Sequence, residues 1–426
     1  AGSLSNAGQI ASQSSSVAID SDADVTNSGN IFSKTEMGID TDGALNNTGE
    51  IFATTALTVK GLSGPNAGAV SNGAAGVLNG ASTSIAAASL NNEGKLLAHN
   101  GALDVALSGN FTNSATVSST QEATLSVDGA ITNTGEVLAT GDLTVKGAQT
   151  ASSGAFSNTG TGRFETAGNL SVNASSVTNS ASLGAHGSNF ALTTTGITSN
   201  SGTLFSKGTA EVTALQLTNT KDILVEAALT LNAATTNGTA AAIKSGSLTT
   251  TGGTIDNQGS IVTHLGDIAI DGTTSFANTG SIEAKGDLNL TLANDLTLTA
   301  GALRAKGNAK ISGAADSSFG NLTVGSGVVI NGETGLAVIA NDLENAGAIG
   351  SSNGTIAIDL TGNLTNTALF YAGTDATFRV DGNITNTEAD ILAENNLTIS
   401  GLNTASAGDL TNTSASIQAI AGNLTL

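Results

Sequence analysis

The sequence predicts an all-β fold, a right-handed parallel β-helix of about 20 coils with about 21 residues in each coil. Three observations lead to this prediction. A short motif recurs at nearly constant spacing, apolar and polar residues alternate inside each copy, and no long stretch has apolar residues at helical spacing. Because a single coil cannot bury its inner face, the coils must stack on one another to form a core.

The recurring motif reads apolar–x–Asn–x–Gly–x–apolar. Clear copies begin at Leu4, Val25, Leu45, Leu90, Ile131, Ile255, Phe276 and Leu343. Other copies fill the gaps, and we place their first apolar positions at Ile197 and, with a less complete motif, at Thr236, Leu298 and Phe319. A spacing of about 20 residues is typical of one solenoid coil.

Short strands and tight corners alternate inside each copy. Leu143-Thr-Val145 and Leu288-Asn-Leu290 show the period of two that a half-buried strand requires. Gly-Asn or Gly-Asp pairs precede such strands, as at Gly109-Asn110 and Gly141-Asp142. We expect these glycines to supply the positive φ angles of a corner.

The asparagine two places after the first apolar residue is the most regular feature of the motif. In stacked coils these side chains would form an amide ladder, in which each amide donates to one neighbour and accepts from the other. The alternative is that asparagine only tolerates a left-handed backbone at an exposed turn, but aspartate and glycine would serve there equally well. We therefore predict a structural ladder through Asn27, Asn47, Asn113, Asn133, Asn366, Asn386 and Asn412.

A longer period of four coils lies above the first. Groups of four coils start near residues 25, 111, 197, 276 and 364, and three related segments lengthen the second coil of a group: 60–68, 146–154 and 400–408. These segments predict loops that leave the solenoid at one corner. We interpret residues 1–426 as one continuous shaft and as a fragment of a longer filament.

Composition excludes several classes of function. The chain has 34 acidic and 13 basic residues, a formal net charge of −21, and no cysteine. Such a surface repels phosphate backbones, so we expect no nucleic-acid partner. No apolar run is long enough for a transmembrane helix, and the lack of cysteine excludes disulfides and thiol chemistry.

The chain offers few residues for catalysis or metal binding. His99, His186 and His264 lie in different copies without a second ligand at metal spacing, and we interpret them as solvated loop residues. The carboxylates are scattered rather than paired, which argues against a polysaccharide-degrading enzyme. The calcium-binding nonapeptide repeat is absent. We expect no catalytic residue, no metal site and no cofactor.

One outward position of the repeat is often large and apolar, although the fold does not require it. This residue follows the second apolar position of the motif. It could pack under its own corner, or it could belong to a lateral stripe that pairs shafts or docks a ligand. The lateral stripe consists of Phe32, Phe52, Leu97, Leu138, Leu224, Val262 and Tyr371, and Ser118 and Glu283 interrupt it.

Two runs carry a resemblance to a known family: Gly109-Asn-Phe-Thr-Asn113, and Ile131-Thr-Asn-Thr-Gly-Glu-Val137 with its continuation to Val145. Residues 362–367 and 382–387 repeat the pattern. They resemble the haemagglutinin repeat of two-partner-secreted exoproteins, which include filamentous haemagglutinins and the stalks of contact-dependent growth-inhibition toxins. The resemblance implies a β-helix exported through an outer-membrane transporter and displayed as a secreted or surface filament of a Gram-negative cell. It is weaker between about 225 and 335.

Two functions are compatible with these observations. The chain could be a structural stalk that holds a receptor-binding or toxin-delivery module away from the cell. Alternatively, the shaft itself could be an adhesin that binds host glycans, matrix or other bacteria. A polysaccharide-degrading β-helix enzyme is a distant third reading, and in the first two cases the partner is a receptor on a host or target cell.

Overall fold

The computed structural model describes residues 2–403 and 406–426 and confirms an all-β parallel solenoid. Strands contain 62% of the residues, in about 20 turns spaced about 20 residues apart. Among the described residues there is no α-helix, only a 3-10 turn at Ala314–Asp316. The chain forms two compact units, one ending at Leu215 and the other beginning at Gln216.

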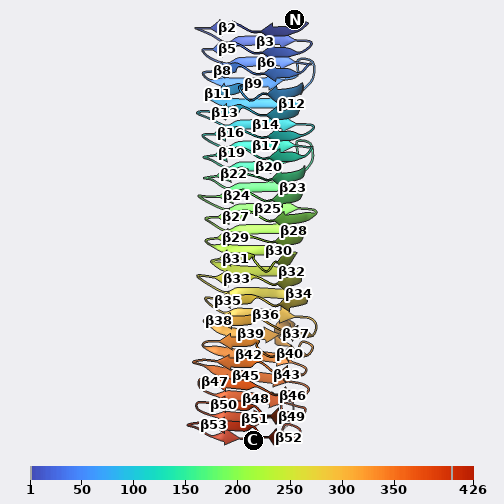
Figure 1. Cartoon of the computed structure of the whole chain (residues 1–426), viewed down its shortest axis with the longest axis vertical. Helices are drawn as coiled ribbons and strands as arrows, with labels where there is room; N and C mark the ends of the chain where they lie inside the picture. Colours follow the sequence, from blue (N-terminus) through green and yellow to red (C-terminus); the bar gives the residue numbers. More distant parts are fainter. Residues whose placement is uncertain (1, 404–405) are drawn as a thin grey trace. The chain divides into compact units, whose positions relative to one another are not determined.

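Each regular coil contains three short strands. The coil that begins at Val25 consists of β4 (Val25–Asn27), β5 (Asn30–Ser33) and β6 (Met37–Thr41). The next coil repeats them as β7 (Leu45–Asn47), β8 (Glu50–Ala53) and β9 (Ala56–Lys60). Equivalent strands pair in parallel, so that β4 lies on β7, β5 on β8 and β6 on β9. Figure 1 shows this stacking along each unit.

We call these three stacks of strands the first, second and third rows. The second row is the most uniform, because all of its strands have four residues. In the first unit they are β2 (Gln9–Ser12), β5, β8, β11 (Val77–Gly80), β13 (Lys95–Ala98), β16 (Thr116–Ser119), β19 (Glu136–Ala139), β22 (Arg163–Thr166), β24 (Ser182–Ala185) and β27 (Thr203–Ser206). In the second unit they are β29 (Asp222–Val225), β31 (Ala242–Ser245), β33 (Ser260–Thr263), β35 (Ser281–Ala284), β38 (Ala302–Ala305), β41 (Val329–Gly332), β44 (Ala348–Ser351), β47 (Leu369–Ala372), β50 (Asp390–Ala393) and β53 (Ser416–Ala419).

The core is a set of columns of apolar side chains that point inward from the three rows. Val25, Ile31, Met37 and Ile39 are at most 1% exposed, and their equivalents in neighbouring coils lie directly above and below them. Burying one such side chain contributes about 1.5–3 kcal/mol. Each inward residue is covered only when its neighbouring coils are in place, which is why the repeats fold together.

Four predicted first positions are wrong by one to three residues. Thr198, not Ile197, pairs with Val177, and Ile197 is 47% exposed. In the second unit the equivalent positions are Thr235, Leu296 and Leu322 rather than Thr236, Leu298 and Phe319. These copies have a polar residue at the first position or lack the motif asparagine, so the sequence pattern does not determine which residue begins the strand. An error of one residue in this position exchanges the inward and outward faces of the strand.

Loops leave the solenoid after strands of the third row, as the long period predicts. They follow β9, β20 (Leu143–Lys146) and β51 (Leu397–Ser400); in the last of these loops residues 404 and 405 lie outside the described residues. The structure adds a fourth loop at residues 313–318, which follows β39 (Asn308–Ser312) and holds the 3-10 turn. This loop also lies in the second coil of its group, although its sequence differs from the other three.

Candidate functional site: the ladders and the outer face of the second row

The motif asparagines lie at the end of the first row and are joined by their side-chain amides. Asn27 donates from Nδ2 to Oδ1 of Asn47 at 2.8 Å, and Asn113 donates in the same way to Asn133 at 2.8 Å. In the first unit such bonds of 2.7–2.9 Å link all the motif asparagines from Asn6 to Asn200. These side chains are almost fully buried, so leaving one amide unsatisfied would cost about 1–3 kcal/mol.

The ladder of the second unit has two parts. The first runs from Asn219 through Asn237 and Asn257 to Asn278. The second joins Asn345, Asn366, Asn386 and Asn412, each at 2.8 Å. Between these parts, Leu298 and Val324 occupy the equivalent positions in β37 (Leu296–Leu298) and β40 (Leu322–Val324). The buried corner therefore tolerates an apolar residue, provided that the neighbouring amides find other partners.

A second stack of polar side chains lies at the Gly-Asx corners, and the sequence analysis missed its function. The Oδ1 atom of Asp142 accepts the backbone N–H of Asn169 at 2.8 Å, and Asn363 accepts that of Asn383 at 2.9 Å. Asn110 makes the same contact to the following coil, and so do Asp24 and Asp342, which do not follow a glycine. These carboxylates are thus engaged in backbone capping, which accounts for an acid or an amide at each such corner.

The expectation that the glycines of these pairs have positive φ is wrong. Among the described residues, the glycines with positive φ are Gly160, Gly253, Gly301 and Gly327, and none precedes an Asn or Asp. The actual requirement is the close approach of neighbouring coils. A Cβ atom on Gly168 would lie 2.6 Å from Oδ1 of Asp142 and 2.6 Å from the backbone of Gly141. Glycine is needed because no side-chain atom fits between the coils.

Three aspartates anchor the loops that leave the third row. Asp42 accepts the backbone N–H groups of Leu62 and Ser63 at 2.9 and 2.8 Å. Asp128 holds the second loop by the N–H groups of residues 148 and 149, and Asp381 holds the last one by those of residues 402 and 403. The hydroxyl of Ser63 also donates to Asp42, and this bond and the backbone bonds lower the pKa of the carboxyl.

The residues of the lateral stripe all occupy the third position of second-row strands and are half-buried. Phe32 and Phe52 pair directly, with ring centroids 5.8 Å apart and an interplanar angle of 1°. The ring of His99 continues this stack, 5.6 Å from Phe52. Leu97 and Leu138 follow in the first unit, and Leu224, Val262 and Tyr371 occupy the same position in the second. Phe205 and Leu392 also hold this position, although the sequence analysis did not include them.

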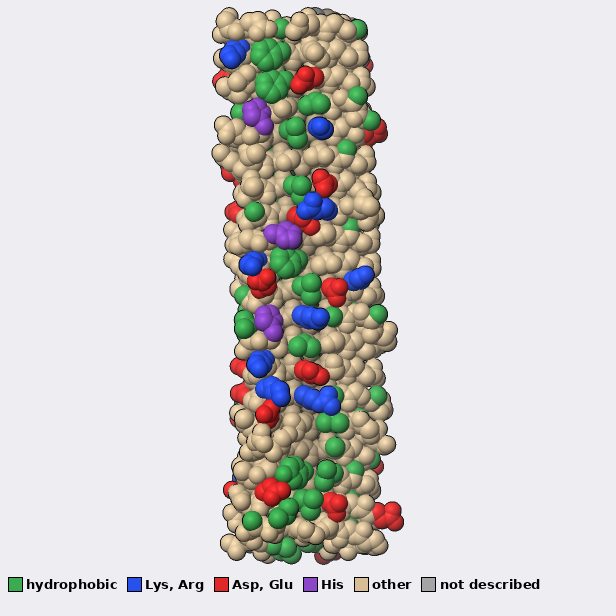
Figure 2. Space-filling view, turned by 60° about the vertical axis from the view of Figure 1, so that its left-hand side comes forward, with side chains coloured by type: hydrophobic (Ala, Val, Ile, Leu, Met, Phe, Trp, Pro, Cys, Tyr) green, Lys and Arg blue, Asp and Glu red, His purple; other side chains and the backbone are tan. Residues whose placement is uncertain are grey.

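The three histidines share a position that the sequence did not reveal. Each one directly follows a second-row strand: His99 follows β13, His186 follows β24 and His264 follows β33. Lys34, Lys207, Lys285 and Lys306 hold the same position after β5, β27, β35 and β38. Figure 2 shows hydrophobic, histidine and charged side chains at the surface of the chain.

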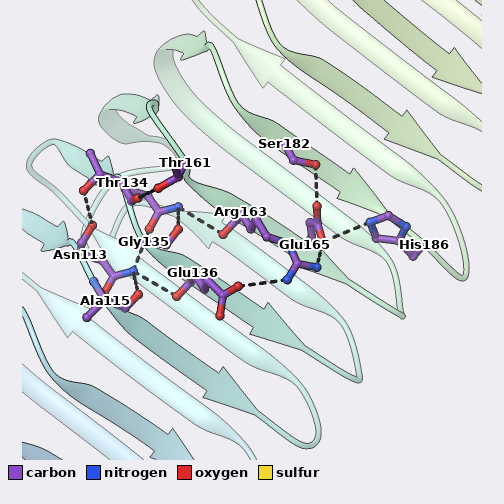
Figure 3. A network of polar contacts seen from close by, with 11 residues as sticks. Asn113, Ala115, Thr134, Gly135, Glu136, Thr161, Arg163, Glu165, Ser182 and His186 are labelled. Carbon is purple, nitrogen blue, oxygen red and sulfur yellow. Dashed lines mark hydrogen bonds and ion pairs between the residues drawn. The ribbon is translucent and has the colours of Figure 1, made fainter.

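The most connected polar group on this face is Glu165, which takes the stripe position of β22. Its side chain is only 8% exposed and lies 2.6 Å from Arg163, 2.5 Å from the hydroxyl of Ser182 and 3.3 Å from Nε2 of His186 (Figure 3). Arg163 also reaches Glu136 at 3.0 Å. Burial raises the pKa of Glu165, but the hydrogen bonds from Ser182 and Arg163 and the neighbouring positive charges bring it below its ordinary value. The network cross-links three consecutive coils through this one carboxylate.

The sequence profile of the haemagglutinin repeat matches residues 1–62, 33–115, 97–160, 304–368 and 372–414, which together make up more than half of the chain. The chain belongs to the haemagglutinin-repeat family. The haemagglutinin-repeat matches leave out residues 161–303. This stretch includes 225–303 of the region where the resemblance is expected to be weak, but it begins earlier, and residues 304–335 are matched. Comparison with curated proteins and with solved structures gave no match.

Membership in the haemagglutinin-repeat family and the β-solenoid fit a filamentous, adhesin-type stalk, since this is a structural and adhesin family rather than an enzyme family. Within residues 2–403 and 406–426, no group of three or more His, Asp or Glu side chains is arranged to hold a metal ion. No helix of the described chain is long and apolar enough to cross a membrane.

Proposed function

We propose that this chain is the stalk of a secreted or surface-displayed filament of a Gram-negative cell, which holds a receptor-binding or toxin-delivery module away from that cell. The observation that carries the proposal is the buried amide ladder. It repeats in nearly every coil of both units, so the most regular residue of the motif serves to stack one coil on the next. Many coils joined in this way are suited to hold a distal module at a distance from the cell.

The proposal includes export through an outer-membrane two-partner-secretion transporter and contact with a receptor on a host or target cell. Its support is the family, together with a chain without cysteine, which needs no disulfide chemistry after export. Adhesion and contact-dependent inhibition both require that a distal module reaches another cell. A stalk contributes length and stiffness to either process.

A deletion of whole coils tests the stalk function. Val25 and Phe111 occupy equivalent first-row positions, four coils apart, so removal of residues 25–110 joins Asn6 to Asn113 in register. The filament should be displayed normally, should still mediate adhesion or inhibition, and should be shorter by about 19 Å at a rise of about 4.8 Å per coil. Electron microscopy measures the length, and a cell-contact assay measures the function.

The matched control is a deletion of residues 25–120, which breaks the register and should abolish display. If the in-register deletion is displayed at the normal level but loses contact with the target cell, the removed coils carry the binding function. That outcome would contradict a stalk function for this region.

The stacked rings of Phe32, Phe52 and His99 favour a second candidate, in which the shaft itself makes adhesive contacts through the lateral stripe. A shallow hollow beside the two phenylalanines is lined by polar groups that include Gln9, Asn30 and Glu50. An aromatic surface with a polar rim is typical of contact sites. Binding of the isolated chain to target cells would favour this candidate over a simple spacer.

A further inference from the structure

Several asparagines of the chain are followed directly by glycine: Asn72, Asn79, Asn100, Asn237, Asn331 and Asn353. Such a pair can react with itself, because the backbone nitrogen of the glycine can attack the side-chain amide carbon of the asparagine. Glycine has no side chain that hinders this approach, and its backbone is the most adaptable. The reaction requires that the N–H of the glycine is free and that the asparagine side chain can turn toward it.

Three of these pairs are held by the strands and by the amide ladder. Asn72 and Asn237 are buried members of the ladder, and the glycine after each donates its N–H to the preceding coil at 2.8 Å. Asn331 lies inside β41, and its Oδ1 atom accepts the hydroxyl of Ser352 at 3.0 Å. In each case the backbone or the side chain would have to leave its hydrogen bonds before it could react.

In two further pairs a buried hydroxyl oxygen accepts the N–H of the glycine. Gly80 donates to the hydroxyl of Thr83 at 3.1 Å, and Gly354 donates to that of Ser351 at 3.2 Å. Thr83 is 1% exposed and Ser351 is fully buried. Both glycine nitrogens are therefore turned inward, away from the asparagine side chain that they would attack.

The remaining pair, Asn100 and Gly101, lacks this protection. It lies at the corner after β13, where Asn100 is exposed. The N–H of Asn100 donates to Ala81 at 3.1 Å, and the carbonyl of Gly101 accepts the hydroxyl of Ser119 at 2.9 Å. Among the described residues, however, none accepts the N–H of Gly101, and none is bonded to the side chain of Asn100.

A single oxygen atom distinguishes this corner from the corner at Asn353. The segments 98–101 (Ala-His-Asn-Gly) and 351–354 (Ser-Ser-Asn-Gly) both begin at the fourth position of a second-row strand. Ser351 provides the hydroxyl that accepts the N–H of the glycine three places later, whereas Ala98 has none.

We propose that Asn100 is a site of spontaneous deamidation, which converts it into aspartate or isoaspartate in the folded chain. The nitrogen of Gly101 forms a bond with Cγ of Asn100 and gives its proton to a base in the solvent. The bond between Cγ and Nδ2 breaks, and ammonia leaves with a proton from water. Water then opens the cyclic imide at either carbonyl, so that the sum of the steps is uptake of water and release of ammonia.

Deamidation changes this corner with time. Either product adds a negative charge, and isoaspartate also adds a methylene group to the backbone between β13 and β14 (Leu103–Leu107). The reaction needs only water and does not depend on the stalk function.

Mass spectrometry of the aged, folded 426-residue chain tests the proposal. After incubation at mildly alkaline pH, cleavage at Lys95 and Lys146 places Asn100 in a different tryptic peptide from Asn79 and Asn353. Asn100 should deamidate about tenfold faster than either, because one hydrogen bond of their glycines must break first. The three rates should become similar in concentrated urea, and a sample digested without incubation gives the baseline.

Two reciprocal variants assign the difference to the hydroxyl. Ala98→Ser should provide an acceptor for the N–H of Gly101 and slow the deamidation of Asn100, and Ser351→Ala should accelerate that of Asn353. We expect a change of about five- to tenfold in each case, the value of one hydrogen bond. Both substitutions suit the fold, because Ser119 pairs with Ala98 and Ala372 pairs with Ser351 at the same position. An unchanged thermal transition shows that each variant is folded.

The proposal is wrong if Asn100 deamidates no faster than Asn79 and Asn353 in the folded chain. Unchanged rates in both reciprocal variants would also contradict it. A third contradictory result is the formation of aspartate without isoaspartate, because direct hydrolysis of the side chain yields aspartate alone, whereas the cyclic imide yields both.

Discussion

The side chain of Asn113 donates a 2.8 Å hydrogen bond to that of Asn133, one coil away, and accepts one of 2.8 Å from Asn92. Replacement of Asn113 by alanine removes both bonds and leaves the buried Oδ1 atom of Asn133 without its donor, whereas the amide of Asn92 keeps the carbonyls of Gly94 and Thr116. We expect Asn113→Ala to lower the free energy of unfolding by about 1–3 kcal/mol, the usual cost of one unsatisfied buried polar group. Urea denaturation measures this change.

Asn46 provides the control for the ladder prediction, because it lies in β7 beside Asn47 but points to solvent. Asn46→Ala should change stability by less than about 0.5 kcal/mol. If both alanine variants have the same unfolding midpoint, the ladder contributes nothing to stability.

Gly168 is required by the close approach of its coil to Asp142. Gly168→Ala should destabilise the protein by about 1–3 kcal/mol, because the added methyl group forces the backbone of the two coils apart. Gly64→Ala should be tolerated, since nothing lies within 4 Å of the Cβ position at Gly64. Thermal unfolding of both variants compares them directly, and equal melting temperatures would show that the coils can separate at no cost.

The stability of the loop that Asp42 anchors should depend on pH. Hydrogen bonds from Ser63 and Leu62 hold the pKa of Asp42 below its ordinary value, so the folded loop favours the ionised form. This stabilisation is present above the ordinary aspartate pKa and is lost as the pH falls through the lowered value. Amide hydrogen exchange at Leu62 and Ser63, normalised to the intrinsic exchange rate at each pH, should show a loss of protection at acidic pH. In Asp42→Asn the protection should be lower already near neutral pH and should vary less with pH.

The Glu165 network should contribute to stability by the same rule. The pKa of Glu165 is lowered, so its contribution is complete above the ordinary glutamate pKa and disappears as the pH falls through the lowered value. Glu165→Gln should cost about 1–2 kcal/mol near neutral pH, because it replaces charge-assisted hydrogen bonds by neutral ones. The difference between wild type and variant should shrink in acid, and a difference that is constant with pH would contradict this account.

The lateral stripe should mediate contact if the second candidate function is correct. The double variant Phe32→Ser, Phe52→Ser removes both stacked rings and should reduce association of the chain with itself or with target cells. Sedimentation velocity and a cell-binding assay measure the two effects. Leu215→Ser, an exposed apolar residue outside the second row, is a suitable control. Unchanged sedimentation and cell binding in the double variant would exclude the stripe as a contact surface.

Most of the fold could be predicted from the sequence, because the repeat determines it. The inward columns and the stacking of coils follow from a period of two within a period of about 20. The prediction fails at Thr198 and Leu296, where the first position is polar or the asparagine is missing. In these coils the register of the strands is determined by contacts with the neighbouring coils. One copy of the motif does not contain that information.

The outer face could be predicted only in part. The positions of Phe32 and Phe52 follow from alternation along the strand. The common position of His99 and His186 depends instead on how many residues each corner and loop inserts between coils. The function of Gly168 also escaped prediction, because the local sequence does not show that another coil passes within contact distance.

The gap in the ladder at Leu298 and Val324 has a mechanical consequence. Asn278 directs its amide to the backbone of Gly280 and Ala302, and the Oδ1 atom of Asn345 accepts the N–H of Gly347. Leu298 and Val324 have no side-chain amide, so the bond between asparagine side chains is missing at this corner of the two intervening coils. A pulling force that peels the second unit coil by coil meets amide cross-links on both sides of this gap. The coils at the gap should therefore unfold at a lower force than the coils on either side. Single-molecule extension should record their unfolding as a separate step at this lower force.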